Sequence, residues 1–210
     1  MVFSILFTLS SIALVVGSWL HILPFSLVED LGFITGALTV WLTVVENIWN
    51  FPIGIANDLF FFALFLQARF FADMSLQIIY VILGFQGWYL WLRGGENKTV
   101  LHVSTTSRKQ LFILALITLA ATYLMMLYLQ HIQDSAPLWD ALTTALSLVA
   151  QYMLNKKFLE NWYFWIIADI IYIPLYIYKQ LYLTSGVYLI FLVMCFLGFR
   201  AWRQSRSKNT

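Results

Sequence analysis

The stretch ENWYFWIIADIIYIPLYIYK, residues 160–179, is an apolar run that contains Asp169, Pro174 and several tyrosines. A helix needs about 20 mostly apolar residues to cross a bilayer, and this run is close to that length. A charged side chain at membrane depth costs several kcal/mol unless it faces a bundle interior or an aqueous cavity. The stretch therefore predicts a transmembrane helix with one polar face turned toward a cavity.

The composition of the whole chain agrees with a membrane protein. Of its 210 residues 61% are hydrophobic and only 10% are charged, whereas a soluble domain carries about 25% charged residues. The first apolar segment is expected to be a retained helix and not a cleaved signal peptide, because no Lys or Arg precedes it. Eight membrane spans are predicted, near residues 3–21, 27–45, 51–69, 73–92, 109–130, 138–155, 162–179 and 183–203.

The charges predict the orientation of these spans and exclude several function classes. With eight spans the loops alternate sides, and one side collects ten of the 12 Lys and Arg residues. The positive-inside rule then predicts that both termini are cytoplasmic. A net charge of +2 gives no reason to expect a nucleic-acid partner, and the single cysteine, Cys195, offers no disulfide or metal cluster. No phosphate-binding loop, zinc-binding histidine pair or catalytic triad is found, so neither an enzyme nor a cofactor is expected.

An internal repeat links the two halves of the chain. Glu46-Asn47 precedes the third span as Glu160-Asn161 precedes the seventh, and GWYLW at 87–91 corresponds to GFRAW at 198–202. Offsets of 111 to 114 residues align these markers, and place Asn57 and Gln67 opposite Asp169 and Lys179. Two parallel repeats of this kind hold a substrate site between them near the bilayer midplane.

The repeat predicts an all-α integral membrane fold with two parallel three-helix bundles joined by a linker helix. The predicted units are an extra N-terminal helix at 1–22, a first bundle at 27–92, a cytoplasmic loop and linker helix at 93–130, a second bundle at 138–203 and a cytoplasmic tail at 204–210.

Polar residues share faces on three of the predicted helices. At about 100° per residue, Asp169, Tyr172 and Tyr176 fall on one face of the seventh span. Lys179 is expected to extend to the outer membrane interface. Two readings stay open at this point, because Asn and Gln also join membrane helices by hydrogen bonds without any substrate, and Asp169 can serve as an ion-pair partner.

Long strings of the sequence resemble the PnuC nicotinamide riboside transporters. The strings are VENIWNFPIGIAND (45–58), FLQARFFADMSLQIIYVILGFQGWYLW (65–91) and the segment LWDAL to YLIF (138–191) followed by LGFRAW (197–202). One departure is Phe51, where many relatives have a second tryptophan. The resemblance implies a fold like that of the SWEET sugar transporters and a homotrimer in the bacterial inner membrane. It also implies facilitated diffusion of nicotinamide riboside for NAD biosynthesis, trapped inside by a cytoplasmic nicotinamide riboside kinase.

The polar faces and the resemblance together give the candidate substrate-binding residues. The pyridinium ring of nicotinamide riboside carries a positive charge. Asp169 is expected to balance this charge, and aromatic residues are expected to stack on the ring by cation–π contact. Amide side chains are expected to hydrogen-bond the ribose and the carboxamide. The candidates are Asn50, Asn57, Gln67, Gln77, Tyr80, Trp88, Gln151, Trp162, Trp165, Asp169, Tyr172 and Tyr176. The alternatives are a transporter of the same fold for thiamine or riboflavin, and a membrane scaffold whose polar faces only join helices.

Overall fold

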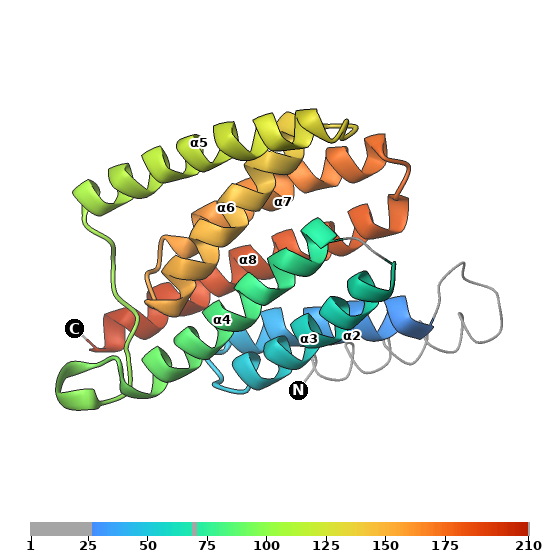
Figure 1. The fold of residues 1–210 in the computed structure, drawn as a ribbon. Helices are drawn as coiled ribbons and strands as arrows, with labels where there is room; N and C mark the ends of the chain where they lie inside the picture. Colours follow the sequence, from blue (N-terminus) through green and yellow to red (C-terminus); the bar gives the residue numbers. More distant parts are fainter. Residues whose placement is uncertain (1–26, 69–70, 210) are drawn as a thin grey trace.

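The chain is all-helical in the part that the structure, a computed structural model, describes: residues 27–68 and 71–209. Seven α-helices and one short 3-10 helix make up this part (Figure 1). Their bounds are α2 (Leu27–Val44), α3 (Asn50–Ala68), α4 (Phe71–Arg93), η1 (Glu96–Lys98), α5 (Arg108–His131), α6 (Pro137–Asn155), α7 (Asn161–Tyr178) and α8 (Tyr182–Asn209).

Each of these α-helices lies within a few residues of a predicted span. The expected first span, 3–21, and the unit 1–22 lie outside the described residues. α8 differs most, because it continues through the predicted tail 204–210 as far as Asn209. Arg206 and Lys208 lie in its last turn, where positive side chains interact favourably with the helix dipole.

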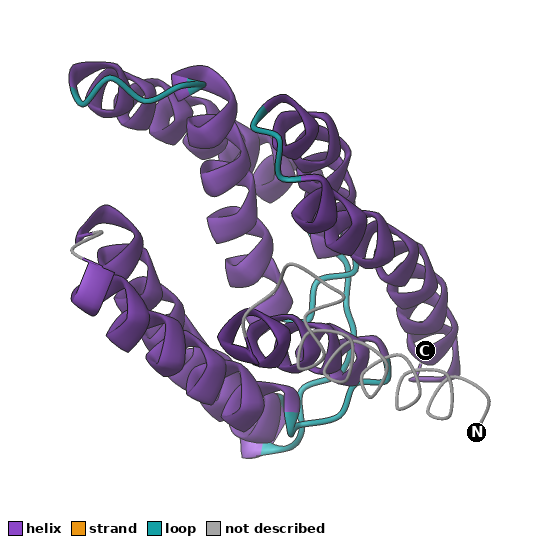
Figure 2. Cartoon of the chain, turned by 90° about the vertical axis from the view of Figure 1, so that its right-hand side faces the viewer, coloured by secondary structure: helices purple, strands orange, loops and turns teal. Residues whose placement is uncertain are grey.

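The helices pack as two sets of three with α5 outside them. α3 packs against α2 and α4, and α7 packs against α6 and α8. α2 contacts α8 and α4 contacts α6, so the two sets meet at two seams, and α5 lies along α6. Figure 2 shows α3 and α4 on one side of the molecule and α7 and α8 on the other.

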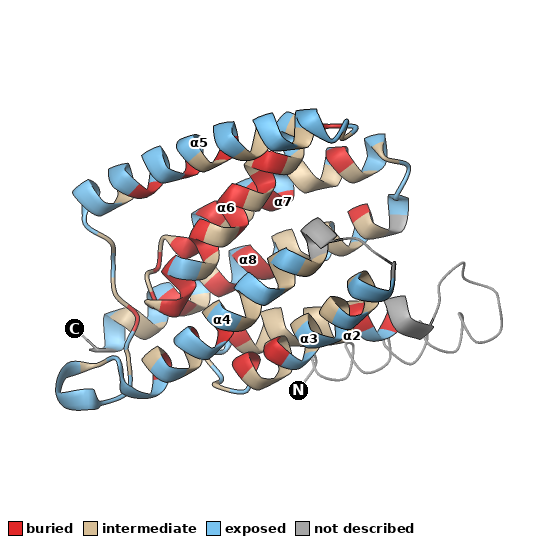
Figure 3. Cartoon of the chain, viewed as in Figure 1, coloured by how far each residue is buried: buried red, intermediate tan, exposed pale blue. Residues whose placement is uncertain are grey.

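The surface is suited to lipid. Four of the described helices, α3, α4, α5 and α8, are long and apolar enough to cross a membrane. On α5, Phe112, Leu119 and Leu124 are each more than 60% exposed, and most of this helix is open to the outside, whereas buried positions concentrate along α6 (Figure 3). Contiguous exposed apolar surface of this kind is costly in water and favourable in a bilayer.

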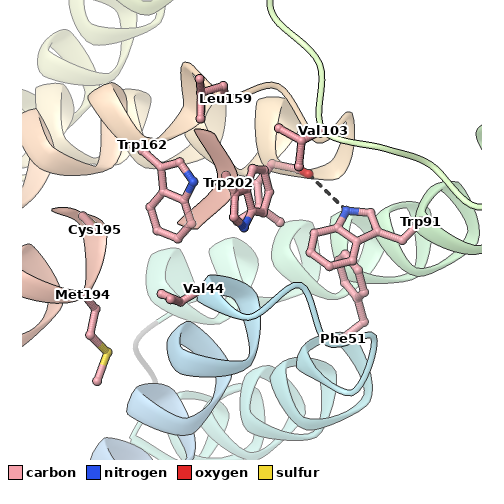
Figure 4. Packing of buried hydrophobic residues seen from close by; sticks show 10 residues of the cluster. Val44, Phe51, Trp91, Val103, Leu159, Trp162, Met194, Cys195 and Trp202 are labelled. Carbon is pink, nitrogen blue, oxygen red and sulfur yellow. Dashed lines mark hydrogen bonds between the residues drawn. The ribbon is translucent and has the colours of Figure 1, made fainter. Parts of the chain in front are cut away.

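Both sets of helices are joined at one end by buried tryptophans. We call it the basic end, because α4 ends there at Arg93 and α5 begins there at Arg108. The indole N–H of Trp91 on α4 donates to the carbonyl of Leu154 on α6, at 3.1 Å. The indole N–H of Trp202 on α8 donates to the carbonyl of Thr43 on α2, at 3.0 Å. The two rings also contact each other, with centroids 5.8 Å apart, so each set is bonded to the backbone of the other. Figure 4 shows the Trp91 bond and the packing of the two rings.

Two similar turns lie beside these tryptophans. α2 ends in a turn in which the N–H of Asn47 donates to Leu42 and that of Glu46 to Thr43. α6 ends in the same way, with Phe158 donating to Met153 and Lys157 to Leu154. This is the Schellman motif, whose left-handed position is usually glycine.

Charged residues occupy the left-handed position of both turns. Glu46 has φ 54° and Lys157 has φ 51°. Their side chains form an ion pair of 2.9 Å, and the ammonium of Lys157 lies 4.3 Å from the centroid of the Trp91 ring. The side chain of Lys157 is only 6% exposed, so this pair is a buried bridge between the two sets of helices.

A second ion pair lies at the opposite end. Lys179, expected to extend to the membrane interface, bonds Asp140 in the first turn of α6 at 2.6 Å. Both side chains are 23% exposed. This pair joins α6 to α7 within one set of helices and leaves Asp169 without a lysine partner.

Candidate functional site

A cavity of about 270 Å³ lies between the two sets of helices. α2, α3 and α4 form one wall, and α6, α7 and α8 form the other. Trp162, Thr43 and Leu154 line it toward the basic end. A side chamber of about 200 Å³ adjoins it among α2, α3, α4 and α6 and shares several lining residues with it. The main cavity has a size that suits a small organic ligand.

The second set of helices supplies an aromatic wall. The Tyr172 and Tyr188 rings lie with centroids 4.4 Å apart, and Tyr176 and Tyr188 stack at 5.1 Å. Phe191 packs against Tyr188 in a T-shaped arrangement, with ring centroids 5.6 Å apart. Tyr172, Tyr188 and Phe191 line the cavity together with Trp165. This wall offers π faces to a planar or cationic ligand.

Asp169 projects from α7 into the same cavity. It is 3% exposed, and the thiol of Cys195 on α8 donates to its Oδ2 at 3.4 Å. No ion pair to Asp169 is found among the described residues. A buried carboxylate with one weak donor retains most of its capacity to accept hydrogen bonds and to attract a cation.

The first set of helices supplies a second carboxylate, Asp58 on α3. It lines both the main cavity and the side chamber. Tyr80 on α4 also lines both spaces, and its hydroxyl lies close to Ser147 on α6. The two carboxylates, Asp58 and Asp169, therefore face one space from opposite sets of helices. Among the described residues that line the cavity and its side chamber, none is Lys, Arg or His.

Amide side chains at the edge of the site are partly used by the protein itself. Asn57 donates to Thr35 and to the carbonyl of Gly32, which joins α3 to α2. Gln151 donates to the Oδ1 of buried Asn155 at 3.1 Å. Asn155 in turn donates to the carbonyl of Leu83 on α4 at 2.7 Å. Helix-joining bonds, one of the two open readings of the sequence, thus occur at Asn57 and Asn155, whereas the bond of Gln151 stays within α6. Asn57 and Gln151 also line the cavity.

The structure brings most of the predicted site residues together and leaves four elsewhere. Those lining the main cavity are Asn57, Tyr80, Gln151, Trp162, Trp165, Asp169 and Tyr172, and Asn50 lines the side chamber. Tyr176 lies behind this lining, stacked on Tyr172 and Tyr188. Gln67 is exposed near the end of α3, Gln77 is half-buried outside both cavities, and Trp88 packs against Phe85 and the tryptophan core.

Several lining residues are missed by the sequence reasoning. Asp58 stands next to Asn57, and an offset of 111 residues, which also separates Glu46 from Lys157, places Asp58 opposite Asp169. The chosen alignment of Asn57 with Asp169 is one residue out of step with that offset. Tyr188, Phe191 and Cys195 lie on α8, whose faces were not compared. A helical wheel of the eighth span, anchored on Gly198 and Trp202, is the signal that would find them.

Comparison with known proteins assigns the family. The sequence profile of the family described as nicotinamide mononucleotide transporter matches residues 26–204. The chain belongs to this family. It is a family of membrane transporters, and with several apolar helices this member is a multi-pass membrane protein.

Named members and a solved structure are similar over most of the chain. The nicotinamide riboside transporter PnuC of Escherichia coli is 28% identical over 206 residues, 86% of each chain. The riboflavin/roseoflavin transporter RibM of Streptomyces davaonensis is 24% identical over 180 residues, 83% of each chain. The crystal structure of the vitamin B3 transporter PnuC superposes with a TM-score of 0.76 at 20% identity, covering 98% of this chain and 91% of that one. The family transporters thus share this fold.

Proposed function

We propose that this chain carries nicotinamide riboside, a form of vitamin B3, across the membrane. The observation that carries the proposal is the cavity between the two sets of helices, with Asp58 and Asp169 facing it, an aromatic wall and no basic residue in its described lining. Nicotinamide riboside has a cationic pyridinium ring on a neutral ribose. Its cation is attracted by the carboxylates and its ring fits the aromatic wall.

Each part of this ligand has a group to meet in the cavity. Asp169 balances the ring charge, and Trp165 or Tyr172 stacks on the ring. Gln151 and Asn50 supply amides for the carboxamide and the hydroxyls. Tyr176 acts indirectly in this proposal, because it supports Tyr172 and Tyr188 from behind.

The same chemistry disfavours the phosphorylated form. Nicotinamide mononucleotide adds a 5′-phosphate, which needs Arg or Lys donors or an array of backbone N–H groups. The described lining offers two carboxylates and no cationic side chain. Repulsion between the phosphate and these carboxylates therefore selects the nucleoside over the nucleotide.

The architecture proposed for this function is a duplicated unit. Residues 27–92 and 138–203 are proposed to be parallel three-helix repeats joined by α5, in the manner of the SWEET transporters. Paired contacts support the duplication, because Trp91 bonds Leu154 and Trp202 bonds Thr43. Trp91 and Trp202 are 111 residues apart, as are Thr43 and Leu154, and the same spacing separates Glu46 from Lys157. The count of eight spans belongs to this proposal, and the expected span 3–21 lies outside the described residues.

Alternating access is the transport mechanism that we propose for this arrangement. The basic end, closed by the Glu46–Lys157 bridge and the tryptophans, is proposed to be the cytoplasmic gate. By the positive-inside rule, this end and both termini are proposed to lie on the cytoplasmic side of a bacterial inner membrane. Uniport driven by intracellular phosphorylation of the product, and assembly as a homotrimer, are proposed from the resemblance to the PnuC transporters.

Ligand-dependent stabilisation of the purified protein tests the substrate. Nicotinamide riboside, its mononucleotide, thiamine and riboflavin are compared in a thermal-shift series in detergent. At 100 times its Kd a ligand stabilises the folded state by about 2.7 kcal/mol. We expect stabilisation by nicotinamide riboside and none by the mononucleotide.

Riboflavin is the second candidate, because the RibM relative transports riboflavin and roseoflavin by its name. Riboflavin is neutral and gives the two carboxylates no counter-charge. Stabilisation by riboflavin but not by nicotinamide riboside would replace the proposed substrate. Absence of any stabilisation would favour a scaffold, and uptake into vesicles with and without a proton gradient would then show whether any vitamin crosses.

A further inference from the structure

Asp58 is the charged side chain in the site that the proposed contacts leave without a role of its own. It lies where the main cavity meets the side chamber and lines both. It is half-buried, and no hydrogen bond or ion pair to its carboxylate is recorded within residues 27–68 and 71–209. Removing a carboxylate from water without a partner is unfavourable, so a ligand group that meets it explains its position.

The two spaces that Asp58 joins differ in chemistry. The main cavity has Trp165, Tyr172 and Tyr188 beside Asp169, which suits the pyridinium ring. The side chamber shares the hydroxyl and amide groups of Thr39, Thr43 and Gln151 with the main cavity and adds Asn50, and none of the residues of the aromatic wall line it. A ligand with a ring at one end and hydroxyls at the other fits with its ring in the main cavity and its sugar toward the side chamber.

The charges of the ligand and of the site support the same ligand orientation. The ligand carries one positive charge, and Asp169, beside the aromatic wall, is placed to balance it. The second carboxylate then needs neutral donors. Vicinal hydroxyls of a ribose are such donors, and an acidic residue that accepts from ribose hydroxyls is the solution used in dinucleotide-binding folds.

We propose that Asp58 is the ribose-reading residue of this transporter, accepting hydrogen bonds from the sugar hydroxyls of the nucleoside. This assignment rests on the proposed function. It gives the two carboxylates separate tasks, with Asp169 recognising the ring charge and Asp58 the sugar. It also predicts that the free base nicotinamide, which lacks the sugar, binds weakly.

The test compares Asp58→Asn with the matched variant Asp169→Asn. Affinities are measured for nicotinamide riboside, its 2′-deoxy analogue and its reduced form, in which the ring is neutral. Asp58→Asn is expected to weaken nicotinamide riboside binding about 10- to 100-fold, the usual effect of losing hydrogen bonds to a charged group. It should also remove most of the preference for the ribose over the deoxyribose form.

Asp169→Asn is expected to give the complementary result. It should keep the preference for the ribose form and lose the preference for the charged over the reduced ring. Because both readouts are ratios of affinities within one variant, a loss of folded protein does not change them. Asp58→Glu, which keeps the charge, provides a further variant expected to retain part of the ribose preference.

Two outcomes separate the assignment from the function. A wild-type ribose preference in Asp58→Asn would overturn the role of Asp58 while leaving the transport of nicotinamide riboside intact. Failure of the wild-type protein to bind nicotinamide riboside would overturn the proposed function and this assignment together.

Discussion

Breaking the Glu46–Lys157 bridge should affect stability unequally, depending on which partner is removed. The Lys157 side chain is 6% exposed and that of Glu46 is 22% exposed. Glu46→Gln leaves the buried ammonium without its counter-charge, and loss of one partner of a buried pair costs about 3 kcal/mol or more. Lys157→Met leaves a carboxylate that water can still reach, so its cost should be nearer to about 1 to 2 kcal/mol.

The charge swap Glu46→Lys with Lys157→Glu adds a test of the duplication. In the present structure the ammonium of Lys157 lies 4.3 Å from the Trp91 ring. Under the proposed repeat, Trp202 lies beside position 46 in the same way that Trp91 lies beside position 157. The swapped lysine should therefore find both a carboxylate and a tryptophan ring, and the double variant should recover most of the stability that either single variant loses.

Two measurements follow these variants. Thermal unfolding in detergent should show a midpoint several degrees lower for Glu46→Gln. Alkylation of Cys195, the single cysteine of the sequence, reports opening of the gate, because its thiol lines the cavity and is 4% exposed. Applied from the basic side, a membrane-impermeant maleimide should react faster with the two single variants than with wild type or the swap.

The reasoning would be refuted by either of two results. A larger stability loss for Lys157→Met than for Glu46→Gln would show that burial of the ammonium does not set the cost. A swap variant no more stable than the single variants would count against equivalence of positions 46 and 157.

Two further predictions concern α8 and α7. Gly198→Ala places a Cβ about 2.3 Å from the buried Trp162 ring and should destabilise the protein by about 1 to 3 kcal/mol. Gly186→Ala has nothing within 4 Å of its Cβ, so it should be neutral or stabilising by up to about 1 kcal/mol. Equal effects of the two variants in thermal unfolding would contradict the packing argument. Pro174 lies inside α7 and lacks the N–H that would bond the carbonyl of Ile170. If this break is a hinge, Pro174→Ala should slow transport in vesicles with little change in affinity, whereas normal flux would remove the hinge.

The sequence predicts the helices well because their signal is local. Apolar runs of membrane-spanning length are bounded by polar turns, as at Ser107, where the side chain and that of Gln110 cap α5 reciprocally. The extent of α8 is missed, because the hydropathy falls at Arg203 while the helix continues to Asn209. Composition reports where lipid ends, and helices can continue beyond it.

The site is less predictable, because it depends on which faces meet. Asp169 and Tyr172 could be found from one helical wheel, since a charge in an apolar run is conspicuous. Gln67 and Gln77 satisfy the same kind of reasoning and lie elsewhere, because a wheel gives an angle and not the helix that faces it. Asp58 is equally conspicuous as the single charge in the apolar run 51–68 and is missed because the repeat is aligned on its neighbour Asn57. Tyr188 required the packing of α8 against α7.

The bridge at the basic end bears on why the two halves belong to one chain. In a symmetric dimer of identical units, a residue at the position of Glu46 would face its own copy across the axis, and like charges would meet. An ion pair between proposed equivalents, Glu46 and Lys157, requires that the two halves differ in sequence, and their fusion into one chain permits this. The same divergence allows Tyr80 and Phe191, which are 111 residues apart as Glu46 and Lys157 are, to be different residue types in the lining of one cavity. Divergence of the two proposed repeats would thus allow the cavity between them to bind a ligand that has no symmetry of its own.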